Sequence, residues 1–103
     1  MDVIQECMNM IAYGGEAKSL ALLAIQQARE KRFPESEASL EKADDALLKS
    51  HQAHTRLLVH EAQGKDINVT ILMLHAADHL GSAETIRALA DELILLHKEI
   101  KHD

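Results

Sequence analysis

The chain has few aromatic residues, prolines and glycines among its 103 residues. Tryptophan is absent, and Tyr13 and Phe33 are the two aromatic side chains. Nucleic-acid binding relies on basic surfaces and stacking aromatics, and the formal charge here is −6, so the composition argues against a nucleic-acid partner. One proline and four glycines, beside abundant Ala, Leu, Glu, Lys and Ile, are typical of helices and not of sheets.

Cysteine and long apolar runs are equally scarce. Cys7 is the single cysteine, so no disulfide can form within the chain. The start Met1-Asp2-Val3 lacks the basic and apolar blocks of a signal peptide. The longest apolar run, residues 69–77, contains polar residues and is far shorter than the ~20 residues of a membrane helix. We therefore expect a cytoplasmic protein with no direct membrane insertion.

Two breaks divide the sequence. Pro34 follows residues 31–33 and is favoured in a first helical turn, while Gly64 is a helix stop followed by Asn68 as a potential cap. The sequence therefore predicts one all-α domain over 1–103, with helices at about 2–31, 34–63 and 69–100. Short turns predict an antiparallel three-helix bundle, and Gly14-Gly15 should weaken or kink its first helix.

The three segments have different apolar patterns. The first places on one face Ile4, Cys7, Met8, Ile11, Gly15, Leu22, Ile25 and Ala28. The second reads in heptads, with Phe33, Leu40, Leu47 and His54 at one seam position and Ser36, Ala43, Ser50 and Leu57 at the other. The third is apolar almost all round, and two neighbouring helices would cover only part of it. We infer that other subunits cover the rest.

A polar group interrupts the third segment at His75-Ala76-Ala77-Asp78-His79-Leu80. The spacing i, i+3, i+4 puts His75, Asp78 and His79 on neighbouring surface of one helix. Because an unpaired buried charge is costly, polar residues in this stretch need a reason.

Four interpretations of this group remain open from the residues alone. The histidines can be partly buried and satisfied by hydrogen bonds, or they can share a metal, although Ala76 replaces the glutamate of a zinc-protease motif. A histidine phosphotransfer domain would typically place lysine where Asp78 stands. Phosphoryl transfer through a phosphohistidine needs a neutral imidazole exposed in a groove, which His75 can supply.

Several motifs together resemble one known family over nearly the whole chain. They are Tyr13-Gly14-Gly15-Glu16-Ala17-Lys18-Ser19, Ser50-His51 with Thr55, and His75-Ala76-x-Asp78-His79-Leu80. These residues resemble the enzyme IIA component of the lactose/cellobiose (diacetylchitobiose) class of the bacterial phosphoenolpyruvate-dependent sugar phosphotransferase system.

The resemblance implies a phosphocarrier that assembles as a homotrimer, a nine-helix bundle. His75 would accept the phosphoryl group from the histidine-containing phosphocarrier protein and donate it to a cysteine of a IIB protein, for uptake of a beta-disaccharide. Asp78 from each subunit would meet on the trimer axis and hold a divalent cation, with magnesium the expected ion. Three converging carboxylates repel one another, and a hard cation with oxygen ligands would relieve that repulsion.

Other residues near the motif are candidates for a groove around His75, namely His51, His79 and Lys18. The sequence departs from the family pattern at Ala77 and His54, where glutamine is usual, and at Gly81, where methionine is usual. The rival interpretation is a non-catalytic oligomeric helical module that binds a partner or regulator, with His75 structural only.

Overall fold

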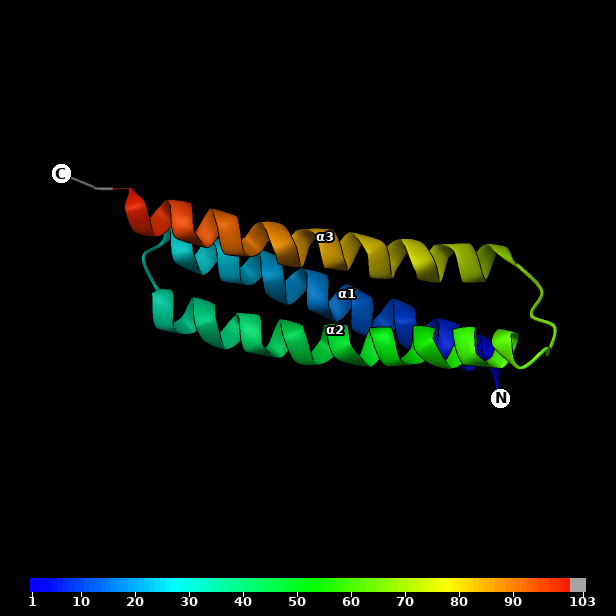
Figure 1. Cartoon of the computed structure of the whole chain (residues 1–103). Helices are drawn as coiled ribbons and strands as arrows, with labels where there is room; N and C mark the ends of the chain where they lie inside the picture. The colour runs from blue at the N-terminus through cyan, green and yellow to red at the C-terminus, as the bar shows by residue number, and fades with distance from the viewer. Residues whose placement is uncertain (101–103) are drawn as a thin grey trace.

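The computed structural model describes residues 1–100 and contains three helices, α1 (Val3–Arg29), α2 (Phe33–Ala62) and α3 (Ile71–Glu99) (Figure 1). No strand occurs within these residues. The predicted all-α, three-helix fold class is therefore confirmed. Each helix begins and ends within two residues of the range expected from the sequence.

Local signals explain most helix ends. The Asp2 carboxylate accepts a hydrogen bond from the Gln5 amide at 3.0 Å and caps α1. Pro34 stands in the first turn of α2, and Gly64, with φ +80°, follows its end. The expectation of an Asn68 cap was wrong. Thr70 caps α3, because its hydroxyl lies closer to the helix and accepts from the Met73 amide at 3.2 Å.

The three helices run side by side in a rod of 61 × 19 × 18 Å. Successive helices are antiparallel, so α1 and α3 run in the same direction (Figure 1). Helix α1 packs along both of the others, whereas α2 and α3 contact each other at few points. One such point is Arg87 of α3, whose guanidinium donates to both carboxylate oxygens of Asp44 on α2.

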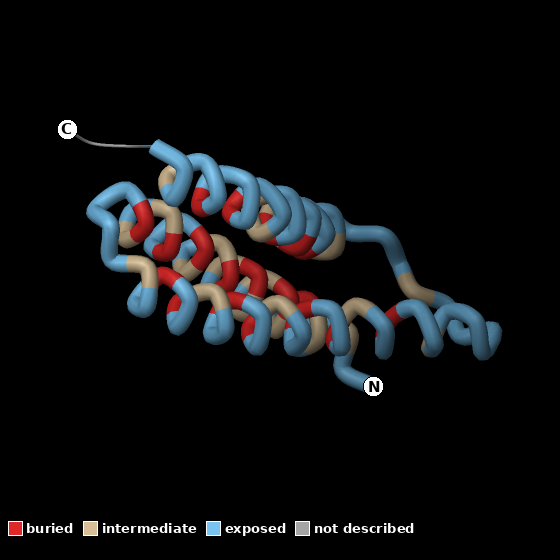
Figure 2. Tube along the Cα trace, turned by 60° about the vertical axis from the view of Figure 1, so that its left-hand side comes forward, coloured by how far each residue is buried: buried red, intermediate tan, exposed pale blue. Residues whose placement is uncertain are grey.

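Small residues make up most of the buried core, which lies on the inward sides of the helices (Figure 2). The buried positions are Cys7, Met10, Gly14, Ala17, Ala21, Ala24 and Ala28 of α1, Ser36, Ser39, Ala43, Ala46, Ser50, Ala53 and Leu57 of α2, and Ala76, Leu80, Ala83, Ala90 and Ile94 of α3. Alanine, glycine and serine let helix backbones approach closely. The packing is therefore tight but buries few large side chains.

Many large apolar side chains lie outside this core. The expected inward face of α1 was partly wrong, because Ile4, Met8 and Leu22 are 67%, 48% and 46% exposed. The buried stripe of α1 follows its small residues instead. On α3, Ile71 and Leu74 are 85% and 61% exposed, so the helix that is apolar all round does present an uncovered side in the single chain.

Three buried serines join α2 to α1. The Ser36 hydroxyl donates to the Ala24 carbonyl at 2.7 Å, and the Ser50 hydroxyl donates to the Met10 carbonyl at 2.9 Å. The Ser39 hydroxyl donates to the Gln27 side-chain oxygen at 2.7 Å. A buried hydroxyl without a partner is costly, and these bonds remove that cost.

The glycine pair does not interrupt α1, which runs through both positions. A β-carbon at Gly14 would lie 3.3 Å from the His79 carbonyl oxygen and 3.4 Å from the Ser50 hydroxyl. A β-carbon at Gly15 would meet nothing within 4 Å. Gly14 therefore permits a close approach of α1 to α3, and this packing outweighs the low helix propensity of glycine.

The two glycines provide a matched test of this packing. Replacing either by alanine adds the same helix propensity, about 0.5–1 kcal/mol. We expect Gly15→Ala to raise the free energy of unfolding by that amount. The free energy of unfolding of Gly14→Ala should be at least about 1 kcal/mol lower than that of Gly15→Ala, because the added methyl group presses on the α3 backbone. Urea denaturation followed by circular dichroism measures both. Equal stabilisation by the two substitutions would contradict the close-approach role of Gly14.

Candidate functional site

The N-terminal third of α3 displays the polar group predicted from the sequence. His75 and Asp78 are exposed, and His79 is half-buried. Ala76 and Leu80, next to the two histidines in the chain, are buried in the core and pack this part of α3 against α1. The helix thus turns its small apolar residues inward and its two imidazoles along one flank.

The two histidines contact each other directly. Their Nε2 atoms lie 3.1 Å apart, and the rings meet edge to face with centroids separated by 4.4 Å. At this distance one Nε2 carries a hydrogen and donates it, while the other accepts with its lone pair. The hydrogen-bonded interpretation of the pair is therefore correct in part, but His75 is exposed and its ring remains accessible.

Helix α1 contacts α3 at the second histidine of this pair. The backbone of His79 lies against Gly14, beside the Ser50 hydroxyl. The segment that resembled the family motif, residues 13–19, thus contributes its first glycine to the placement of His79. Lys18 is half-buried one turn further along α1, on the same side as Gly14.

His51 lies elsewhere. Its Nε2 lies 3.2 Å from a carboxylate oxygen of Glu84 on α3, a contact that is an ion pair when the imidazole is protonated. Glu84 follows His75 by nine residues, which is about two and a half helical turns, so the two residues point from opposite sides of α3. The structure therefore places His51 on the α2 side of α3, away from the His75–His79 flank.

Asp78 lines a shallow hollow on the outer side of α3. The other residues around it are Ala77, Gly81, Ser82, Thr85 and Ile86. Within the described residues 1–100, no three His, Cys, Asp or Glu side chains are grouped so as to hold a metal ion. One chain thus offers a single carboxylate with two hydroxyls nearby, and a cation at Asp78 would need further oxygen ligands, from water or from other copies of the chain.

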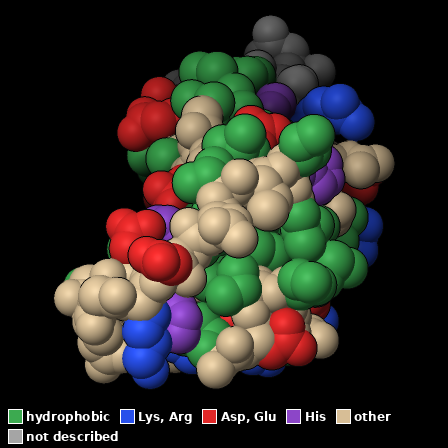
Figure 3. Space-filling model, turned by 90° about the vertical axis from the view of Figure 1, so that its right-hand side faces the viewer, with side chains coloured by type: hydrophobic (Ala, Val, Ile, Leu, Met, Phe, Trp, Pro, Cys, Tyr) green, Lys and Arg blue, Asp and Glu red, His purple; other side chains and the backbone are tan. Residues whose placement is uncertain are grey.

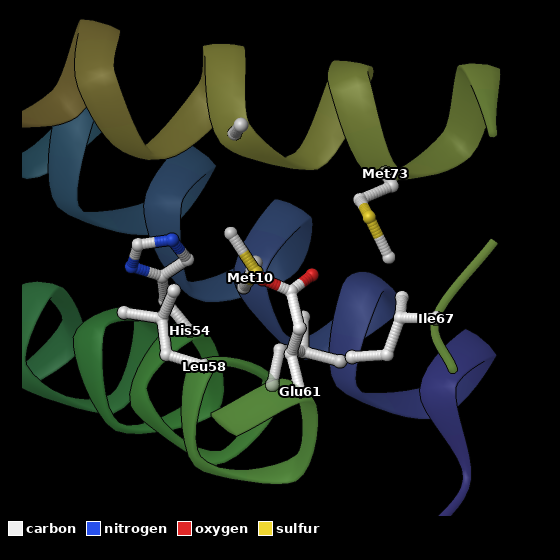
Figure 4. A pocket seen from close by; sticks show the side chains of 8 residues that line it. Met10, His54, Leu58, Glu61, Ile67 and Met73 are labelled. Carbon is white, nitrogen blue, oxygen red and sulfur yellow. The ribbon is translucent and has the colours of Figure 1, made fainter. Parts of the chain in front are cut away.

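A second hollow of about 100 Å³ lies between all three helices (Figure 4). It is lined by Met10, His54, Leu57, Leu58, Glu61, Ile67, Met73 and Ala77. Two positions at which the sequence departs from the family pattern, His54 and Ala77, therefore share one hollow, while Ala77 and Gly81 border the hollow of Asp78. The three departures from the family pattern therefore lie close together, on one side of α3 and on the part of α2 that faces it.

Comparison with known proteins identifies the family. The family described as "PTS system, Lactose/Cellobiose specific IIA subunit" matches residues 5–98. The chain belongs to this family. Its members are phosphotransferase components that transfer phosphoryl groups in sugar uptake, so the chain is a phosphotransferase component.

Relatives in this IIA family differ in the sugar that they are named for. The chain is 43% identical over 93 residues to the galactose-specific EIIA component of Lactococcus lactis subsp. cremoris, which covers 90% of this chain and 80% of the relative. The crystal structure of the cellobiose-specific enzyme IIA from Bacillus anthracis has a TM-score of 0.92 at 33% identity and covers 96% of this chain and 91% of its own.

A further IIA structure was solved together with a partner. The solution structures of the IIA(chitobiose)–HPr complex give a TM-score of 0.85 at 29% identity, covering 99% of each chain. Because similar chains carry galactose, cellobiose and chitobiose in their names, overall similarity does not assign a sugar here. None of the helices in residues 1–100 is long and apolar enough to cross a membrane.

The residues that lie beside Asp78 and His51 were not identified from the sequence. Ser82 and Thr85 lie near Asp78, and the spacing i, i+4, i+7 was a signal that could have placed them together. Glu84 as the partner of His51 had no such signal, because the pair joins two helices.

Cys7 does not belong to the site. Its side chain is buried in the core cluster with Met10 and Leu57, and burial, with a smaller contribution from Glu6, raises the pKa of its thiol. A raised pKa leaves less thiolate at any given pH, and the thiolate is the nucleophile. Cys7 is thus a packing residue and a poor candidate for a nucleophile.

This assignment predicts slow alkylation of Cys7. At pH 8 we expect iodoacetamide to modify the folded protein much more slowly than the same chain in concentrated urea, because burial lowers both access and the thiolate fraction. Raising the pH toward the elevated thiol pKa should accelerate the reaction of the folded protein. Mass spectrometry gives both rates, and equal rates with and without urea would refute the packing role.

Proposed function

We propose that this chain is the cytoplasmic phosphocarrier IIA of a sugar phosphotransferase system, with His75 as the residue that receives and passes on the phosphoryl group. The observation that supports it is an exposed imidazole at position 75, beside a second imidazole, in a chain of the IIA family. The first partner is the histidine-containing phosphocarrier protein, and the second is the cysteine of a IIB protein.

The geometry suits in-line transfer. A ring nitrogen of neutral His75 attacks the phosphorus of the donor's phosphohistidine, a new N–P bond forms, and the bond to the donor nitrogen breaks. If the hydrogen between the two Nε2 atoms lies on His79, then Nε2 of His75 is the unprotonated acceptor, and its lone pair becomes free for the attack when the His79 ring turns aside. His79 thereby positions the nucleophile, and a thiolate of the IIB protein later takes the phosphoryl group from His75.

The partner assignment rests on likeness and charge. A IIA structure of this family has been solved in complex with HPr. This chain carries a net charge of −6, which would favour encounter with a basic donor surface. Leu74, 61% exposed next to His75, offers apolar area for docking.

The homotrimer is part of the same proposal. Its support is the uncovered apolar side of α3, where Leu89 and Leu96 are 50% and 52% exposed in the single chain. Figure 3 shows hydrophobic side chains over much of the end of the bundle that carries the α2–α3 connection. Assembly through α3 would bring three copies of Asp78 together, and a divalent cation such as Mg²⁺ would neutralise their repulsion.

A phosphorylation assay tests the acceptor. With phosphoenolpyruvate and the general phosphotransferase proteins, we expect wild type to gain an acid-labile phosphoryl group and His75→Ala to gain none. His51→Ala is the matched control, since His51 is also an exposed histidine but pairs with Glu84 on the other side of α3. We expect it to be labelled like wild type.

Two results of this assay would count against the proposal. Labelling that survives His75→Ala but is lost in His79→Ala would move the acceptor to position 79. Absence of any labelling in folded wild type would favour the rival function, a non-catalytic helical interaction or regulatory module.

Asp78→Leu tests the assembly. Replacing the carboxylate by an apolar side chain removes both the repulsion and the cation ligand, so we expect the stability of the trimer to lose all dependence on Mg²⁺ and to differ from wild type without the ion. Analytical ultracentrifugation with Mg²⁺ or with EDTA measures this, with Asp66→Leu, an exposed aspartate of the loop, as control. A monomeric wild type at micromolar concentration would contradict the homotrimer.

A further inference from the structure

We propose that His75 and His79 also form a chelating site for a transition-metal dication of the Zn²⁺ class, separate from any cation at Asp78. Nothing in the phosphocarrier role calls for such a site. It is suggested by the pair of imidazole nitrogens that meet on one accessible flank of α3.

The spacing of the two nitrogens suits a chelate. Zinc–imidazole bonds are about 2.0–2.1 Å long, and cis ligands at 90–109° then place their nitrogens roughly 2.9–3.4 Å apart. The Nε2 atoms of His75 and His79 lie 3.1 Å apart. Because one helix supplies both residues at i and i+4, its backbone keeps their β-carbons close enough for the two rings to share one ion.

Accessibility allows the metal to enter. His75 is exposed and His79 half-buried, so both lone pairs can turn from each other toward a shared point by side-chain rotation alone. In the neutral pair one Nε2 bears a hydrogen, and binding moves that proton to Nδ1 of the same ring through water, with no net proton release. Water completes the coordination, since within residues 1–100 no third His, Cys, Asp or Glu is grouped with the pair so as to hold a metal ion.

The chemistry of the donors selects the metal. Imidazole nitrogens suit Zn²⁺, Cu²⁺ and Ni²⁺, whereas Mg²⁺ prefers oxygen ligands. A saturating concentration of Mg²⁺ should therefore leave the histidine pair free while it occupies any carboxylate site. This difference separates the two kinds of site in one sample.

The site has a consequence that rests on the proposed function. A metal bound to Nε2 of His75 occupies the lone pair that attacks phosphorus, so the metal-loaded protein cannot accept a phosphoryl group there. Zinc would then act as a reversible inhibitor of loading, and a chelator would restore the transfer.

Zinc titration tests the binding directly. In a buffer with excess Mg²⁺, isothermal calorimetry and the NMR signals of the histidine rings should report Zn²⁺ at His75 and His79 of wild type. We expect His75→Ala and His79→Ala each to weaken binding about 100-fold, because the second imidazole of a chelate acts at a high effective concentration. His79→Gln, which keeps a polar side chain at this position, should show the same loss, and His51→Ala should bind like wild type.

The outcomes separate this inference from the proposed function. If His51→Ala loses as much affinity as His79→Ala, or if either His75→Ala or His79→Gln retains wild-type affinity, the chelating site does not exist. In the labelling assay, the rate for wild type should fall with Zn²⁺ and recover with EDTA, whereas labelling unaffected by bound Zn²⁺ would refute the inhibition. Failure of labelling without any zinc would refute the phosphocarrier role and leave the titration to decide the site.

Discussion

The close approach of α1 to its neighbours is the constraint on which the rest of the structure depends. Gly14 lies so near the His79 carbonyl that even a β-carbon would be 3.3 Å from it. Along the remainder of α1, the buried positions are held by alanine, whose small side chain also lets neighbouring helices approach. This contact fixes the height and rotation of α3, and hence where the imidazoles of His75 and His79 emerge.

A core built from small residues has an energetic consequence. Burying a leucine side chain contributes roughly 1.5–3 kcal/mol, and burying alanine contributes far less, since the stabilisation scales with apolar area. The single chain therefore gains modest stability from its interior, while large side chains such as Ile71 remain outside. Because small residues fill the core and large apolar residues lie outside it, the single chain has both tight helix packing and a large uncovered apolar surface.

The two histidines of the site differ in their surroundings although they share a helix face. His79 is half-buried and its backbone lies against Gly14, whereas His75 is exposed. A half-buried imidazole beside an exposed one is an arrangement in which the first can orient the second through their hydrogen bond. The same arrangement leaves two nitrogen donors close together, which is why phosphoryl transfer and metal chelation would compete for one atom.

The sequence by itself determined the three helices, their approximate ends and the common face of His75, Asp78 and His79, because periodicity, proline placement and i, i+4 spacing are local properties. The tertiary structure alone decided which residues of α1 are buried, why Gly14 is needed, and that His51 pairs with Glu84. These depend on the direction from which a neighbouring helix approaches. Apolar periodicity marks a broad face, but the small residues within it select the line of contact.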